Sequence, residues 1–234
     1  RTWWLLVGAL GLGAAVAKSG LLKRTTLLML SVMPASYLGQ ALALFATGVL
    51  VCPAIPSVTA KVAITGKFIP ALAEGLGCDE KSRGSAGLFL AMYLGFVLAA
   101  PMYMTATSTN LFLVELLPAH EASRMTWLFW LRAATPPVLL AAVLGLGAIM
   151  LLFKPQGGRA ADKARVVADL RALGPLSRSE KITLVLLLSA LLAWITESWH
   201  GQHPATVALA ALALLFASKA MDKLTLHAEV GWSA

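Results

Sequence analysis

The stretch that most constrains the fold is Pro53-Ala54-Ile55-Pro56-Ser57-Val58-Thr59-Ala60-Lys61, which interrupts a long apolar run over residues 40–76. Two prolines three residues apart exclude one continuous helix, because each lacks an N–H and clashes with the preceding turn. Each flanking half is shorter than the about 20 residues that a membrane-spanning helix needs. Residues 40–76 are therefore predicted to form a re-entrant hairpin, with a helix on each side of a non-helical tip.

The composition indicates a polytopic all-α membrane protein. Hydrophobic residues make up 59% of the chain, charged residues 13%, and the mean hydropathy is +0.78, which excludes an ordinary soluble domain. The net charge of +8 comes from basic residues clustered beside apolar runs. We interpret them as topology signals and expect the lipid bilayer, and no nucleic acid, as a partner. Because another apolar segment starts near its end, we interpret the chain as part of a longer protein.

Apolar segments separated by polar connectors divide the rest of the chain. Residues 1–39 are expected to form a first transmembrane helix and an interfacial connector, residues 86–118 a broken transmembrane helix, and residues 126–153 a further transmembrane helix. A cytoplasmic amphipathic linker over 154–181, with a helix lying on the membrane, then leads to a truncated pair of helices over 182–234. The pattern Ser177-Arg178-Ser179-Glu180 is a capping box that opens the first of this pair.

Basic residues predict which side of the membrane each connector faces. Four connectors are basic or rich in charge and are predicted to be cytoplasmic: 18–24, 77–85, 154–181 and 219–223. The short turns at 119–125 and 199–204 are predicted to lie on the opposite side. Trp127 and Trp130, close to one of these turns, are interpreted as part of an interfacial aromatic belt.

A second polar break, Thr105-Ala106-Thr107-Ser108-Thr109-Asn110, interrupts the apolar segment over 86–118. Five of these six side chains carry a hydroxyl or an amide, which is costly in lipid unless they face something polar. The alternative is that the hydroxyls bond back to helix carbonyls. Two polar breaks in one chain favour a paired site. Helix N-termini at such breaks attract carboxylates, and carbonyls and hydroxyls there suit Na⁺.

Three further charged positions leave alternatives open. Lys61, in the first turn of the second hairpin helix, either strengthens attraction for an anion or makes a structural contact. Lys67 and Glu115 are interpreted as structural. Glu197, His200 and His203 have the spacing of a metal site, but they lie in a turn and form no HExxH helix. An intramembrane metal-dependent hydrolase is therefore a second hypothesis, and a non-transporting membrane anchor or sensor is a third.

The hairpin tip and the break Met104-Thr105-Ala106-Thr107-Ser108-Thr109-Asn110 resemble those of the divalent anion:sodium symporter family. So do the opening Trp4-Leu5-Leu6-Val7-Gly8-Ala9 through Lys18-Ser19-Gly20-Leu21, and Gly174-Pro175-Leu176-Ser177-Arg178-Ser179-Glu180-Lys181. The likeness is greatest to the branch with bacterial anion permeases and plastid 2-oxoglutarate/malate translocators.

This resemblance implies an elevator-type secondary transporter, not an enzyme, in a bacterial inner membrane. It would be a homodimer at full length, built from two inverted repeats of which this chain carries one. The substrates would be di- or tricarboxylates such as succinate, malate, 2-oxoglutarate or citrate, carried by anion exchange or Na⁺ symport. No resident cofactor or metal is implied beyond Na⁺ as coupling ion. The family tip reads Ser-Asn-Thr, whereas this chain has Ser57, Val58 and Thr59.

The resemblance also implies two sets of site residues. Those expected to bind the substrate are Ser57, Val58, Thr59, Lys61, Thr107, Ser108, Thr109 and Asn110. Those expected to frame the cation are Ser57, Thr59, Thr105, Ala106 and Asn110.

Overall fold

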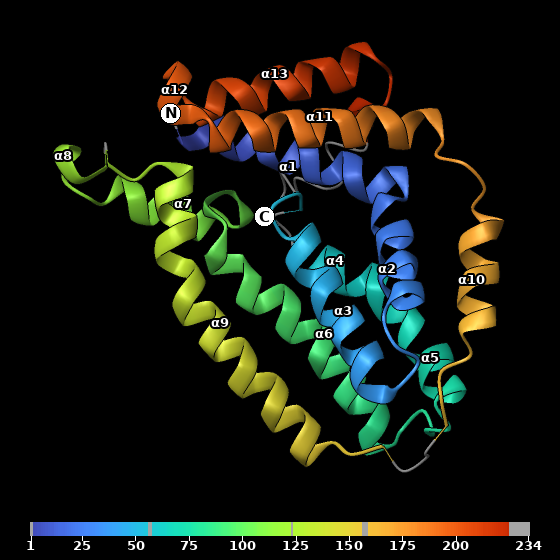
Figure 1. Ribbon diagram of the computed structural model, residues 1–234. Coiled ribbons are helices and arrows are strands. Elements are labelled where there is room, and N and C mark those ends of the chain that lie inside the picture. Colours follow the sequence, from blue (N-terminus) through green and yellow to red (C-terminus); the bar gives the residue numbers. More distant parts are fainter. Residues whose placement is uncertain (1, 56–57, 123, 156–158, 225–234) are drawn as a thin grey trace.

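The computed structural model describes residues 2–55, 58–122, 124–155 and 159–224, and every regular element within these ranges is a helix. This confirms the all-α fold class. The helices fall into two groups (Figure 1). We call α1, α11 and α13 the first helix group, and α2, α3, α6 and α9 the second.

The α-helices are α1 (Thr2–Ser19), α2 (Leu21–Val32), α3 (Tyr37–Val51), α4 (Val58–Thr65), α5 (Ile69–Gly75), α6 (Arg83–Met102), α7 (Ser108–Glu115), α8 (Ala119–Ala122), α9 (Trp127–Leu152), α10 (Lys163–Ala172), α11 (Arg178–Ile195), α12 (Glu197–His200) and α13 (Pro204–Ala217). Two 3₁₀ turns, η1 (Gly66–Phe68) and η2 (Met104–Ala106), connect α4 to α5 and α6 to α7.

The first helix group lies along one edge of the molecule, with α1, α11 and α13 in mutual contact (Figure 1). Its core is an apolar cluster in which Leu12, Trp194 and Leu215 are buried. The shortest of these helices, α13, is 14 residues long and almost wholly apolar. It is therefore held by packing on its neighbours rather than by an amphipathic pattern.

The second helix group is organised around the contact between α3 and α6. The two backbones approach so closely that a Cβ added at Gly48 would lie 2.5 Å from the carbonyl carbon of Gly95. A Cβ at Gly95 would meet the carbonyl oxygen of Phe45 at the same distance. Only glycine fits both positions, as is usual where membrane helices pack closely. Helix α9 covers α6, and α2 covers α3 (Figure 1).

A sharp bend at Gly20 joins the two groups. Helices α1 and α2 meet there at 65°, and Gly20 has a φ of +88°, a conformation that glycine adopts at little cost. Just past the bend, Arg24 Nε donates to Glu180 Oε1 at 2.7 Å, and Arg24 Nη1 donates to the Gly174 carbonyl at 2.9 Å. The capping box of Ser177 and Glu180 is confirmed. Because Glu180 lies at the start of α11, its ion pair with Arg24 fixes the start of α11 against α2.

Two helices in the described ranges, α6 and α9, are long and apolar enough to cross a membrane, and the bent pair of α1 and α2 would be a third span. The two halves of the predicted hairpin, α3 and the run from α4 to α5, are each shorter than a span. The structure therefore has the helix lengths of an integral membrane protein in which several apolar segments are bent or broken.

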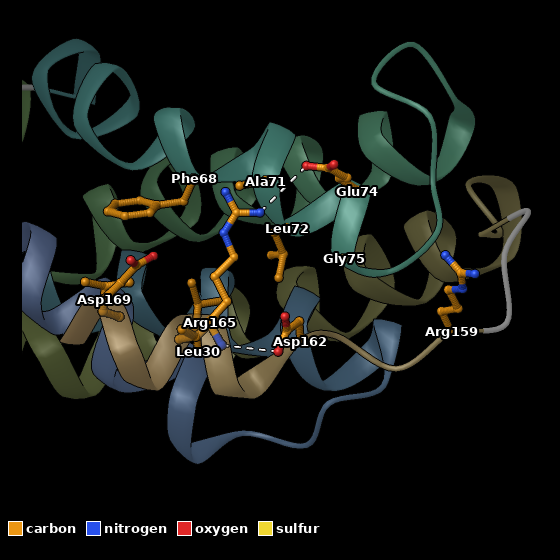
Figure 2. A pocket seen from close by; sticks show the side chains of 12 residues that line it. Leu30, Phe68, Ala71, Leu72, Glu74, Gly75, Arg159, Asp162, Arg165 and Asp169 are labelled. Carbon is orange, nitrogen blue, oxygen red and sulfur yellow. Dashed lines mark hydrogen bonds and ion pairs between the residues drawn. The ribbon is translucent and has the colours of Figure 1, made fainter. Parts of the chain in front are cut away.

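Helix α10 packs on α2 and near α5, around a cavity of about 360 Å³ (Figure 2). Leu30, Phe68 and Leu72 line it, and Arg165 reaches across to Glu74 with 3.8 Å between the charged atoms. Val166 of α10 packs against the core of the second helix group. That this helix also lies on the membrane stays a prediction.

The interpretation of Trp127 as part of an aromatic belt is wrong. Its side chain is only 2% exposed and belongs to the core of the first helix group. A belt tryptophan keeps its ring at the membrane surface, whereas this one is enclosed by packed helices.

The close contact between α3 and α6 predicts that Gly48→Ala lowers the stability of the protein. The added Cβ would meet backbone atoms, which cannot move aside by changing a side-chain rotamer. We therefore expect the free energy of unfolding to fall by about 1–3 kcal/mol. Gly147→Ala in α9 is the matched control, because a Cβ there has no neighbour within 4 Å. Thermal unfolding in detergent should show a lower melting temperature for Gly48→Ala only. Equal melting temperatures would contradict the packing.

The pair of Arg24 and Glu180 predicts a loss of stability in acid. Hydrogen bonding to the Arg24 guanidinium holds the pKa of the Glu180 carboxyl below its usual range. In this acidic range the folded state therefore binds fewer protons than the unfolded state. The pair stabilises the folded protein fully above the pKa of Glu180 in the unfolded chain, about 4.3. This stabilisation is lost as the pH falls through the lower pKa that Glu180 has in the folded protein. We expect the melting temperature to fall in this acidic range, and Glu180→Gln to flatten the fall. Glu74→Gln, which changes an exposed pair, should keep the wild-type profile. If the Glu180→Gln profile also matched the wild type, the assignment would be wrong.

Candidate functional site

The predicted hairpin tip lies between α3, which ends at Val51, and α4, which begins at Val58. Ser57 lies outside the described residues, and the side chain of Thr59 is also outside the description. Val58, at the position of the family asparagine, is half-buried and packs against the apolar core of the second helix group. This position therefore supplies an apolar contact in place of an amide.

Lys61 is the best-defined charged group near the tip. It is fully buried, its Nζ donates to Cys52 Sγ at 3.2 Å, and it lies 5.6 Å from the centre of the Phe96 ring. Cys52 caps the C-terminal end of α3, where the helix dipole is negative. The ammonium of Lys61 therefore lies between the negative end of α3 and the electron-rich face of an aromatic ring.

The second break separates α6 from α7. After α6 the backbone is extended at Tyr103, forms the turn η2, and is extended again at Thr107. Thr107 Oγ1 then accepts from Asn110 N at 3.3 Å and caps α7. Thr105 Oγ1 accepts from Trp127 Nε1 at 3.3 Å. Neither bond is the back-bonding to a preceding helical turn that the sequence left open.

Asn110 holds the break together. It is 5% exposed, and its amide nitrogen donates to the Ala100 carbonyl at 2.9 Å and to the Tyr103 carbonyl at 3.0 Å. The Trp130 indole donates to a third carbonyl, that of Pro101, at 2.9 Å. The last carbonyls of a helix have no partner within the helix, so these side chains replace the missing donors.

The two breaks meet at an apolar cluster of Cys52, Ala99, Ala100 and Ala106. Cys52 comes from the end of α3 and Ala106 from η2, so a residue beside the first break and a residue of the second belong to the same packed cluster. Lys61 reaches this cluster through its bond to Cys52.

The remaining candidates spread away from this meeting point. Thr107 is half-buried, Thr109 is exposed, and the side chain of Ser108 lies outside the description. Lys67 and Glu115 are exposed on other parts of their helices. The structure therefore brings Lys61, Thr105, Ala106 and Asn110 to one region and leaves Thr109 at its edge.

Sequence reasoning missed four residues of this region: Cys52, Phe96, Trp127 and Trp130. Cys52 and Phe96 carry no local signal, since they are apolar positions within apolar helices. The two tryptophans are three residues apart and so share one helix face, which was the available clue.

The three side chains of the proposed metal trio are engaged separately. Glu197 Oε2 accepts from Trp127 N at 3.3 Å, His200 Nε2 lies 2.8 Å from the Ala193 carbonyl oxygen, and His203 Nδ1 accepts from Ala205 N at 3.1 Å. Burial raises the pKa of the Glu197 carboxyl. Within the part of the chain that the structure describes, no three His, Cys, Asp or Glu side chains gather around a possible metal position.

The family described as the sodium:sulfate symporter transmembrane region matches residues 1–234. Three relatives show the range of similar proteins. The putative malate transporter YflS of Bacillus subtilis is 28% identical, over 99% of this chain and 50% of its own length. Dicarboxylate transporter 1 of the spinach chloroplast (Spinacia oleracea) is 25% identical, over 98% and 42%. The citrate/succinate antiporter of Escherichia coli is 26% identical, over 92% and 45%. The chain thus spans about half the length of the curated relatives it matches.

The contacts of Asn110 predict that Asn110→Ala destabilises the break. The buried Ala100 carbonyl loses the Asn110 donor, whereas the Tyr103 carbonyl keeps the Ala106 N–H at 2.9 Å, and an unsatisfied buried group costs about 1–3 kcal/mol. Thr109→Ala is the matched control, because Thr109 is next to Asn110 in the sequence and its side chain is exposed. Thermal unfolding should separate the two variants clearly. A melting temperature of Asn110→Ala equal to that of Thr109→Ala would contradict the assigned hydrogen bonds.

Proposed function

The chain belongs to the family of sodium:sulfate symporter transmembrane regions, and we propose that it forms one half of a secondary transporter for di- or tricarboxylate anions. The names of its relatives, a malate transporter, a dicarboxylate transporter and a citrate/succinate antiporter, support this substrate class. They favour a transporter over a metal-dependent hydrolase. The bacterial relatives support a location in the inner membrane of a bacterium.

The observation that carries this proposal is the contact of the two helix breaks beside a buried lysine. Helices α4 and α7 both begin at a break, and the free N–H groups of a helix N-terminus suit a carboxylate. In transporters with inverted repeats, such half-helices line a substrate site near the middle of the membrane. Ser57, Val58, Thr59, Thr107, Ser108 and Thr109 would add contacts around this region, with Lys61 and Asn110.

The mechanism we propose is an elevator movement between the two helix groups. The core of the first group also includes Met104, Leu111 and Trp127, from η2, α7 and α9, and the second group is held by the α3–α6 contact. The bend at Gly20 and the connector that contains α10 join them. A second repeat would complete the substrate site, and the full-length protein would be a homodimer.

For the coupling ion, we propose exchange that does not depend on Na⁺. Thr105, one of the residues expected to frame the cation, already accepts from Trp127 Nε1, and Asn110 of the same set directs its amide nitrogen at the Ala100 and Tyr103 carbonyl oxygens. These oxygens keep further lone pairs, but each has a positive partner directed at it. Lys61 adds a buried positive charge that attracts an anion far more strongly than it would in water.

The test is transport by the full-length protein in proteoliposomes loaded with unlabelled malate. Labelled malate or succinate should enter at the same rate with and without a Na⁺ gradient, and entry should require dicarboxylate inside. Strict dependence on Na⁺ would contradict the exchange mechanism. If no carboxylate were transported and none raised the melting temperature, the alternative of a membrane anchor or sensor would replace the transporter.

The role of Lys61 predicts that Lys61→Gln lowers exchange at least ~10-fold, if the variant removes ~1.4 kcal/mol of anion stabilisation. Lys67→Gln is the matched control, because it removes the same charge from an exposed position between α4 and α5. Cys52→Ala removes the thiol but keeps the charge, and should retain most of the activity. Melting temperatures of all three separate folding from transport. Normal exchange by Lys61→Gln would rule out this electrostatic role.

A further inference from the structure

Two tryptophans in the first turn of α9 are directed at the break between α6 and α7. The Trp127 indole donates to the Thr105 hydroxyl oxygen at 3.3 Å, and the Trp130 indole donates to the Pro101 carbonyl at 2.9 Å. Residues three apart lie on one face of a helix, so α9 presents both donors to the same short segment. The two contacts differ in kind, because one reaches a backbone carbonyl and the other a side chain of the candidate cation set.

The position of Trp127 is fixed from three sides. Its ring is 2% exposed and stacks on Tyr103 with 6.1 Å between the ring centres. Its backbone N–H donates to Glu197 Oε2 at 3.3 Å, which joins it to α12 at the end of the first helix group. A ring held by packing, stacking and a capped backbone cannot turn away from Thr105, so its N–H stays directed at that hydroxyl.

This bond limits what the Thr105 hydroxyl can do. An indole N–H donates and does not accept, so the Thr105 oxygen must be the acceptor. The hydroxyl hydrogen and the remaining lone pair are then confined to the other directions around the oxygen. Thr105 is itself 2% exposed, so bulk water does not compete for the bond.

We propose that Trp127 is a positioning residue of the transport site, which orients the Thr105 hydroxyl so that its hydrogen can be donated to a bound carboxylate anion. This inference rests on the proposed function, since it assigns Thr105 to the site that the two breaks form. Trp127 would act on the bound ion only through Thr105. Its loss should therefore weaken binding and leave the maximal rate nearly unchanged.

The experiment compares Trp127→Phe with Trp194→Phe in the full-length protein. Phenylalanine keeps a buried ring, which can stack on Tyr103, but it removes the N–H. Trp194 is the matched control, because it is 1% exposed and its indole donates to the Pro204 carbonyl at 3.2 Å within the first helix group. Both variants lose one buried hydrogen bond and should lose similar stability.

For Trp127→Phe, we expect the KM for succinate or malate exchange to rise about five- to tenfold, the effect of losing one hydrogen bond of ordinary strength. The maximal rate should stay within about twofold in the same assay. Trp194→Phe should keep the wild-type KM. Equal KM values for the two variants would overturn the inference and leave Trp127 with a structural role only.

A double-mutant cycle in stability gives a readout that does not depend on transport. Trp127→Phe and Thr105→Val should have non-additive effects on the melting temperature, since each removes the same bond. Additive effects would overturn the inference. If the wild type exchanged no carboxylate, the proposed function would fail by itself. The rise in melting temperature with succinate or sulfate would then decide the role of Trp127, and an unchanged rise in Trp127→Phe would overturn it.

Discussion

The structure depends on satisfying the backbone groups that a broken helix leaves unpaired. Inside a membrane, water does not reach these groups, so the protein itself must supply their partners. At the end of α6 the Asn110 amide serves the Ala100 and Tyr103 carbonyls, and the Trp130 indole serves that of Pro101. These donors come from α7 and α9. The break is therefore a fixed junction of three helices, and it can hold polar groups at a defined position.

The second requirement is close packing between the hairpin and α6. Gly48 and Gly95 let the backbones of α3 and α6 approach more closely than any side chain at these positions would permit. This contact brings Cys52, at the end of α3, into one apolar cluster with Ala106 of η2. The meeting of the two breaks thus follows from glycines that lie a turn or more away from it. A region built in this way is as rigid as the helices that carry it.

Lys61 shows how a charge is kept inside such a protein. An ammonium without partners is costly away from water. Here it has the Cys52 thiol, the face of Phe96 and the negative end of α3, none of which carries a full opposite charge. Its positive charge is stabilised but not neutralised. Arg24 differs, because it forms an ion pair with Glu180 and fixes one helix against another. Among the described residues, Lys61 forms no ion pair with an acid, and such a buried cation can attract an anion, whereas a paired one serves the fold.

The sequence by itself determined the features that act over a few residues. Prolines and polar side chains set the two breaks, hydropathy set the all-α membrane class, and Ser177 with Glu180 set the start of α11. The contacts that build the site were decided only by tertiary structure. Trp127 was interpreted as part of an interfacial aromatic belt, and neither Cys52 nor Phe96 was predicted as a site residue. The physical reason is that apolar helices in a membrane are apolar on nearly every face, so periodicity does not indicate which face meets protein. The face that meets protein is selected instead by small residues, which allow helices to approach closely. It is also selected by unpaired backbone carbonyls, which need hydrogen-bond donors from a neighbouring helix.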